Sequence, residues 1–121
     1  MAKNQPEQEL QKSVVQWLNV AAPNLLYYSV PNAINIKGGG RAGAYNKSMG
    51  VRPGVADLCF ILSQGRAAFI ELKAEGGRQT DSQKAFQAEC EKRHTPYHIC
   101  RSLDDVEETL RDWAVPLRIS K

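Results

Sequence analysis

Two apolar segments joined by a very short turn lie in the middle of this sequence. Residues 55–62 and 67–73 combine apolar side chains with the β-branched and aromatic residues that favour strands. Only residues 63–66 lie between them, and a connection this short joins antiparallel neighbours. The sequence therefore predicts a β-hairpin in which the start of the first strand lies opposite the end of the second.

Two carboxylates and one ammonium group meet at the open end of this predicted hairpin. Asp57 stands near the start of the first strand and Glu71 near the end of the second, so the two side chains are expected to be neighbours. Glu71 and Lys73 are two residues apart and therefore point to the same face of the sheet. This set fits Mg²⁺, which is usually held by one or two carboxylates together with water and substrate phosphate. The alternative is an ion-pair cluster on the surface.

Helix and strand patterns alternate on both sides of the hairpin. The further predicted elements are a helix over residues 5–21, a strand over 25–30, a helix from Thr80 or Asp81 to about Arg93, a strand over 97–100, and a helix from Ser102 or Asp104 through Trp113. The order α-β-β-β-α-β-α predicts an α/β fold with a mixed sheet flanked by helices. A chain of 121 residues suits one domain, and we expect its core within about residues 7–114.

A glycine-rich basic segment, residues 31–54, connects the first predicted strand to the hairpin. It contains six glycines, two prolines and no acidic residue. Its cations are Lys37, Arg41, Lys47 and Arg52. A long connection of one charge sign favours an anionic partner, and nucleic acid is the commonest such partner. We therefore expect a flexible loop whose cations contact phosphates, with a solvated basic loop as the alternative.

The remaining composition is that of an ordinary globular protein. Hydrophobic residues make up 42% of the chain, charged residues 24%, and the net charge is +3. The longest purely apolar run, residues 58–62, is far shorter than the ~20 residues that a membrane span needs, and residues 1–6 lack the apolar segment of a secretory signal. Three cysteines, an odd number, indicate reduced thiols. These features predict a cytoplasmic protein.

Four short motifs resemble those of one nuclease family. Residues 50–57 read Gly-Val-Arg-Pro-Gly-Val-Ala-Asp, residues 71–73 read Glu-Leu-Lys, residues 80–83 read Thr-Asp-Ser-Gln, and residues 30–32 read Val-Pro-Asn. Together they resemble the PD-(D/E)xK nucleases and, more specifically, the virus-type replication-repair nuclease (VRR-NUC) domain. The resemblance covers roughly residues 7–110, with Ala56 standing where the family usually has proline.

This resemblance implies a restriction-endonuclease-like core and hydrolysis of DNA phosphodiester bonds with Mg²⁺ or Mn²⁺. It implies that Asp57, Glu71 and the backbone carbonyl of Leu72 bind the metal ion. It further implies that Lys73 positions or activates water, and that Gln83 completes the site through a hydrogen bond. Stand-alone members resemble homodimeric junction-resolving nucleases. Branched DNA, such as a Holliday junction, is then the expected substrate, in a bacterial or phage-infected cell where DNA is repaired.

A glutamate from the N-terminal helix also belongs to the family site, and both Glu7 and Glu9 lie in the predicted helix. Glu7 shares a helix face with Leu10 and Val14, whereas Glu9 falls on the solvated side. A carboxylate on an inward face is costly unless it is paired or close to a metal ion. We therefore expect Glu7 to be the site residue, with a first-turn acid favoured by the helix dipole as the alternative.

Two other function classes are open on this sequence. The chain could keep the fold and the basic segment but bind DNA without cleaving it. Alternatively, Cys90, His94, His98 and Cys100 could form a tetrahedral Zn²⁺ site in a small interaction module. Their spacing matches no common structural zinc pattern, so buried cysteines beside ordinary surface histidines are the simpler interpretation.

Overall fold

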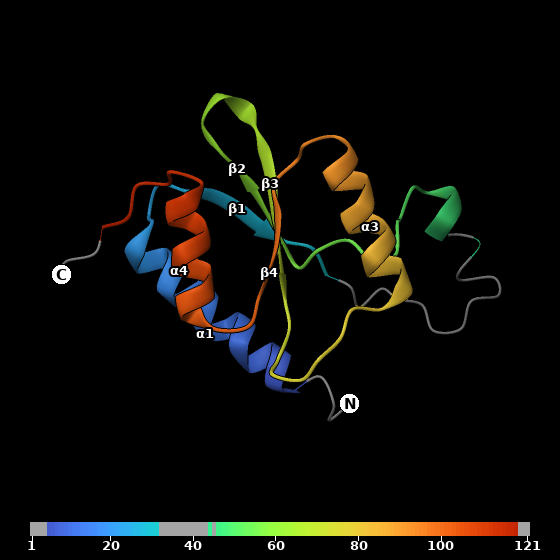
Figure 1. Ribbon diagram of the computed structural model, residues 1–121, viewed down its shortest axis with the longest axis horizontal. Coiled ribbons are helices and arrows are strands. Elements are labelled where there is room, and N and C mark those ends of the chain that lie inside the picture. The colour runs from blue at the N-terminus through green and yellow to red at the C-terminus, as the bar shows by residue number, and fades with distance from the viewer. Residues whose placement is uncertain (1–4, 32–43, 45, 119–121) are drawn as a thin grey trace.

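A four-stranded mixed sheet forms the centre of the protein (Figure 1). In the computed structural model, which describes residues 5–31, 44 and 46–118, the strands are β1 (Leu26–Ser29), β2 (Leu58–Ile61), β3 (Ala67–Leu72) and β4 (Tyr97–Cys100), side by side in chain order. The β1–β2 and β2–β3 pairs are antiparallel, whereas β3 and β4 are parallel. The α/β class, the order of the elements and the mixed sheet predicted from the sequence are confirmed.

Helices cover both faces of the sheet (Figure 1). α1 (Gln5–Ala21) and α4 (Leu103–Asp112) lie together on one face, and α3 (Asp81–Lys92) lies on the other. The parallel β3–β4 pair depends on α3, because a chain leaving the end of one strand needs a crossover before it can run beside that strand in the same direction. Within the described ranges, no helix has the length and apolar character needed to cross a membrane.

The main hydrophobic core fills the space between the sheet and the α1–α4 pair. Alternate residues of β2 and β3 point into it, as the two-residue period of a strand requires, and each helix contributes one apolar face. The buried members are Val14, Leu18, Leu58, Phe60, Leu62, Ala68, Ile70, Leu72, Cys100, Val106 and Leu110. Trp113, just after α4, packs edge-on against Phe60 with ring centroids 5.8 Å apart. This core provides most of the apolar burial that stabilises the domain.

A smaller aromatic layer lies on the opposite face, beneath α3. Phe69 of β3 meets Phe86 of α3 edge-on with ring centroids 5.0 Å apart, and the Tyr97 ring lies 6.1 Å from Phe86. Glu71 follows Phe69 by two residues on β3 and therefore points to this same face, where it contacts Tyr97. The strand alternation thus separates the charged groups of β3 from the main core.

Two details differ from the sequence-based prediction. β2 begins at Leu58 and not at residue 55, because its ladder with β1 ends at the Ser29–Leu58 pair. In the basic segment, residues 46–48 are helical, so the expectation of an irregular loop over all of residues 31–54 is wrong there. Gly50 follows this short helix, and its φ of +87° is the left-handed conformation typical of the residue just beyond a helix C-terminus. Residues 32–43 and 45 lie outside the described residues.

Gly54 carries the chain past the first turn of α3 on its way to β2. Its φ is +84°, and a Cβ atom at this position would lie 2.3 Å from the backbone oxygen of Ser82. The same turn is closed by a capping box, in which the Thr80 hydroxyl accepts the N–H of Gln83 and the Gln83 side chain accepts the N–H of Thr80. A residue without a side chain is therefore required where the chain approaches Asp57.

We expect Gly54→Ala to lower the free energy of unfolding by about 3 kcal/mol, because the new methyl group would meet backbone atoms and the left-handed conformation disfavours alanine. Gly76→Ala is the matched control, since Gly76 has a φ of +81° but nothing lies within 4 Å of a Cβ placed there. The free energy of unfolding of Gly76→Ala should fall by only about 1 kcal/mol. Urea denaturation of both variants measures the difference, and equal losses would contradict the close approach of Gly54 to α3.

Candidate active site

Asp57 is the residue before β2, at the edge of the sheet where the hairpin opens. The register pairs Leu58 with Ile70, so one further step along the ladder brings Asp57 beside Glu71. The Asp57 carboxylate oxygen Oδ2 accepts the backbone N–H of Leu72 at 2.7 Å, and the Asp57 carbonyl accepts the N–H of Val30 at 2.9 Å. The structure therefore places Asp57 and Glu71 together, as the hairpin pattern predicts.

Glu71 and Lys73 are charged side chains that are almost fully buried, with exposed fractions of 1% and 6%. Lys73 Nζ lies 3.6 Å from Oε2 of Glu71 and 3.9 Å from Oε2 of Glu7 on α1. Burial, and then the neighbouring Asp57 carboxylate, raise the pKa of Glu71 to about 7, although Lys73 acts in the opposite direction. The single ammonium group of Lys73 therefore does not outweigh the effect of burial and of Asp57 on Glu71.

Glu7 is the glutamate of α1 that reaches this cluster. Its carboxylate lies beside Lys73, whereas Glu9, two residues further along the helix, is exposed. The choice between the two from the apolar face of the helix agrees with the structure. α1 thus contributes a side chain to a site that is otherwise built from the sheet.

Tyr97 reaches the same carboxylate and Gln79 reaches Tyr97, and neither residue belongs to the set predicted from the sequence. The Tyr97 hydroxyl donates to Oε1 of Glu71 at 3.4 Å, and Gln79 Nε2 donates to the Tyr97 hydroxyl oxygen at 3.2 Å. Burial, followed by the charge of Glu71, raises the pKa of the Tyr97 phenol far above its usual range. The phenol is therefore a hydrogen-bond donor at neutral pH. The contact between Tyr97 and Glu71 depends on the parallel pairing of β4 with β3, which no local sequence pattern indicates.

Arg101, directly after β4, anchors the turn that follows Lys73. Its Nη1 donates to the carbonyl oxygens of Ala74 and Gly77, at 3.0 Å and 2.9 Å. The inner side of this turn faces the cluster, since a Cβ atom on Gly77 would lie 3.3 Å from Oε2 of Glu7 and 3.6 Å from Cδ of Lys73. Arg101 therefore supports one wall of the site. The sequence contains no motif that indicates this role.

The structure describes three of the remaining predicted site residues. Gln83 uses its side-chain oxygen as part of the α3 capping box, where it accepts a backbone N–H at 2.8 Å. Lys47 and Arg52 are exposed, and the Arg52 guanidinium lies over the Phe86 ring, 5.9 Å from its centroid. Two further predicted DNA-contacting residues lie outside the described residues, namely Lys37 and Arg41.

The zinc alternative is wrong for this fold. Cys90 belongs to α3 on one face of the sheet, whereas Cys100 faces the main core on the other, where its Sγ lies 3.5 Å from Oγ1 of Thr109. The sheet thus separates the two cysteines, and Cys90, His94, His98 and Cys100 do not converge. Over the described ranges, no three or more His, Cys, Asp or Glu side chains are grouped so that they could hold a metal ion. The three cysteines are free and buried.

The donors at the hairpin fit a cation that needs few protein ligands. Asp57 and Glu71 offer carboxylate oxygens, and the Leu72 carbonyl is a third hard oxygen in the same stretch of backbone. Mg²⁺ usually keeps several waters and takes one or two carboxylates from the protein, so it does not need a cage of three acidic side chains. The pKa of Glu71 is raised first by burial and then by the Asp57 carboxylate, and a cation bound beside Glu71 would favour its ionised form.

Comparison with known proteins gives the class of this site. The sequence profile of the VRR-NUC domain matches residues 3–104, a range that includes Glu7, Asp57, Glu71 and Lys73. The chain has a nuclease-type domain of a kind that generally uses divalent metal ions, with DNA as the implied substrate. It belongs to the VRR-NUC family.

Solved structures share the fold of this chain. One, described as a VRR-NUC domain protein, superposes with a TM-score of 0.68 at 20% sequence identity and covers 92% of this chain and 90% of its own. Another, described as a VRR-NUC domain, has a TM-score of 0.59 at 19% identity, with 89% and 97% covered. No curated protein matches the sequence. At these identities the two structures bear on the fold alone.

We expect Arg101→Ala to loosen the turn after Lys73, because two hydrogen bonds from a charged donor are lost. The free energy of unfolding should fall by about 1 kcal/mol, and the Gly77 amide, which bonds to the Ala74 carbonyl, should exchange faster with solvent. Arg111→Ala is the control, since Arg111 forms an exposed helical pair with Glu107 that should contribute about 0.5 kcal/mol or less. Hydrogen exchange followed by NMR measures the Gly77 amide in both variants. An unchanged exchange rate of Gly77 in Arg101→Ala would contradict the role of Arg101 in holding this turn.

Proposed function

We propose that this protein is a metal-dependent endonuclease that hydrolyses phosphodiester bonds of DNA, with Mg²⁺ or Mn²⁺ as cofactor. The observation that carries the proposal is the convergence of Asp57 with the buried Glu71 and Lys73 at the open end of the hairpin. Buried charged groups are costly, and strongly shifted titratable groups gather at sites where they serve chemistry. Membership of the VRR-NUC family supports the same class of reaction.

Asp57, Glu71 and the backbone carbonyl of Leu72 are the residues that we propose to hold the metal ion. When bound, the cation would polarise the phosphoryl group and lower the pKa of water, which supplies a nucleophile near neutral pH. Asp57 is held for this task by its hydrogen bond to the Leu72 N–H. Glu71 is held by burial, with one oxygen toward Lys73.

Lys73 is proposed to orient the attacking water and to offset the charge that develops on the phosphate. Its ammonium group lies 3.6 Å from Glu71 and 3.9 Å from Glu7, and these two carboxylates fix its position from the sheet and from α1. Glu7 therefore acts by holding Lys73. The side-chain amide nitrogen of Gln83 is proposed to donate to a phosphate oxygen, while the oxygen of the same amide stays in the α3 cap.

The basic segment is proposed to grip the phosphates of the DNA backbone. The exposed guanidinium of Arg52 lies over Phe86 on α3, whose ring belongs to the aromatic layer beside Glu71. Lys37, Arg41 and Lys47 are the other proposed contacts. Because phosphate contacts carry no sequence information, these residues would set affinity and its salt dependence but no sequence preference.

We expect Lys73→Ala to abolish metal-dependent cleavage while DNA binding persists, because the proposed phosphate grip lies on other residues. Cleavage of a labelled four-way junction and of a matched linear duplex, with Mg²⁺, Mn²⁺ or EDTA, measures the activity, and a gel-shift assay measures binding. Lys92→Ala is the matched control, since Lys92 pairs with Glu89 at the exposed end of α3. Wild-type cleavage by Lys73→Ala would overturn the assignment, and salt-sensitive binding without cleavage by the wild type would indicate a non-catalytic DNA-binding protein.

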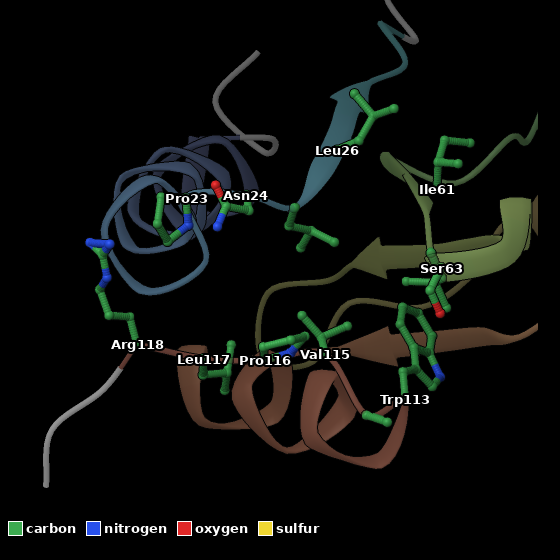
Figure 2. Close-up of a pocket in the computed structure, with 13 residues that line it drawn as sticks. Pro23, Asn24, Leu26, Ile61, Ser63, Trp113, Val115, Pro116, Leu117 and Arg118 are labelled. Atoms are coloured by element: carbon green, nitrogen blue, oxygen red, sulfur yellow. The ribbon is translucent and has the colours of Figure 1, made fainter.

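We further propose that the protein acts as a homodimer on branched DNA. β1 is an outer strand of the sheet, and its side chains Leu26 and Tyr28 are 61% and 53% exposed. Beside β1, a groove of about 560 Å³ lies between the ends of α1 and β2 and the segment after α4, with Leu26, Ile61 and Trp113 around it (Figure 2). An outer strand with apolar side chains pairs readily with another strand, and a second copy supplies the same strand. A two-fold dimer would present two sites, one for each symmetric cut in a junction.

We expect Leu26→Glu to convert a dimer into a monomer and to reduce cleavage of the junction more than cleavage of linear duplex. Buried in the interface, the new carboxylate would lack a partner, whereas in a monomer it would stay in water. Sedimentation equilibrium at micromolar concentration gives the mass. Val20→Glu is the control, because Val20 is also exposed, at 71%, but lies on α1, outside both β1 and the basic segment. A wild-type monomer, or equal cleavage of both DNAs by the wild type, would contradict this part of the proposal.

A further inference from the structure

The two carboxylate oxygens of Glu71 have different neighbours. Oε2 lies 3.6 Å from Nζ of Lys73, whereas Oε1 accepts the hydroxyl of Tyr97 at 3.4 Å. Tyr97 comes from β4, outside the hairpin and outside every motif that the sequence shares with the family. It therefore adds a contact to Glu71 that the hairpin cannot supply.

The ring of Tyr97 is held so that its hydroxyl has little freedom to move. β4 runs parallel to β3 with Tyr97 opposite Phe69, and this register places the Tyr97 ring on the face to which Glu71 points. Phe86 packs against both rings, at 5.0 Å from Phe69 and 6.1 Å from Tyr97 between centroids. Aromatic packing therefore fixes the direction in which the hydroxyl points.

Gln79 gives this hydroxyl a preferred direction of donation. Gln79 Nε2 donates to the Tyr97 oxygen at 3.2 Å and to Oε1 of Gln87 at 2.9 Å, and Gln87 in turn donates to Glu91 at 2.9 Å. Because the Tyr97 oxygen already accepts a hydrogen from Gln79, its own hydrogen is directed to the remaining partner, Oε1 of Glu71. The polar chain thus runs from the surface of α3 to the buried carboxylate.

We propose that Tyr97, oriented by Gln79, is a positioning residue that engages Oε1 of Glu71 and thereby presents Oε2 to the divalent cation and to Lys73. This inference rests on the proposed function. Groups that hydrogen-bond a metal-binding carboxylate fix its orientation, and their loss typically costs about 10- to 100-fold in metal affinity or activity. Tyr97 touches neither the DNA nor the reacting atoms in this role. Its effect passes entirely through the orientation of Glu71.

The test is Mn²⁺ binding to the metal-free protein in the absence of DNA, measured by electron paramagnetic resonance of free Mn²⁺. We expect Tyr97→Phe to weaken Mn²⁺ binding about 10-fold, and Gln79→Leu to weaken it less and in the same direction. Tyr27→Phe is the matched control, because the Tyr27 hydroxyl also donates to one side chain, Asn19, but on β1 away from the cluster. Its Mn²⁺ affinity should equal that of the wild type.

Cleavage assays separate orientation of the metal site from a general structural effect. At limiting Mn²⁺ the kcat of Tyr97→Phe should fall about 10-fold, the KM for DNA should stay unchanged, and excess Mn²⁺ should restore most of the rate. A loss of folded protein would instead lower the apparent kcat at every Mn²⁺ concentration, because excess metal ion would not replace the missing enzyme. In that case Gln79→Leu, which keeps the ring, decides the question.

The outcomes distinguish the two proposals. If the wild-type protein neither binds Mn²⁺ nor cleaves DNA, the proposed function fails and the role of Tyr97 fails with it. If the wild type binds and cleaves but Tyr97→Phe and Gln79→Leu match Tyr27→Phe in Mn²⁺ affinity, only the positioning role is overturned.

Discussion

The hydrogen bond from the Leu72 N–H to the Asp57 carboxylate sets the geometry of the whole charged cluster. A distance of 2.7 Å is at the short end for an N–H to oxygen hydrogen bond, and this bond joins Asp57, directly before β2, to Leu72, the last residue of β3. Since Leu72 lies between Glu71 and Lys73, this single contact fixes Asp57 relative to both. The Asp57 backbone also accepts the N–H of Val30, so the end of β1 is tied to the same point.

Strand alternation then determines what each residue of this stretch does. Leu72 points into the main core beneath α1 and α4, whereas Glu71 and Lys73 point away from it. The apolar side chains hold the strand against the core. Burial of the charged side chains costs free energy, and the raised pKa of Glu71 reflects this cost. Glu7 from α1 and Tyr97 from β4 complete the surroundings of that charge. A favourable core on one face thus supports an unfavourable charge cluster on the other.

The hairpin, the order of elements and the meeting of Asp57 with Glu71 could be predicted because they depend on local signals, namely a short turn and a two-residue period. Glu7 could be chosen over Glu9 from the apolar face of its helix. Tyr97 and Arg101 could not be found this way, because their contacts depend on the register between β3 and β4, which are joined through α3. The helical turn at residues 46–48 could not be predicted, because the glycines on both sides of it favour a loop.

The spread of these side chains along the chain has a consequence for folding. Asp57 and Glu71 come together when a turn of four residues closes, a step with a small entropic cost. Glu7 and Tyr97 arrive only after α1 has docked and after the crossover through α3 has brought β4 to the sheet, and pairings between distant parts of a chain form slowly. A nascent chain that has made only the hairpin therefore carries both acids without the groups that hold Lys73 and Glu71 in place. The four side chains Glu7, Asp57, Glu71 and Tyr97 therefore come together only when the whole domain has folded.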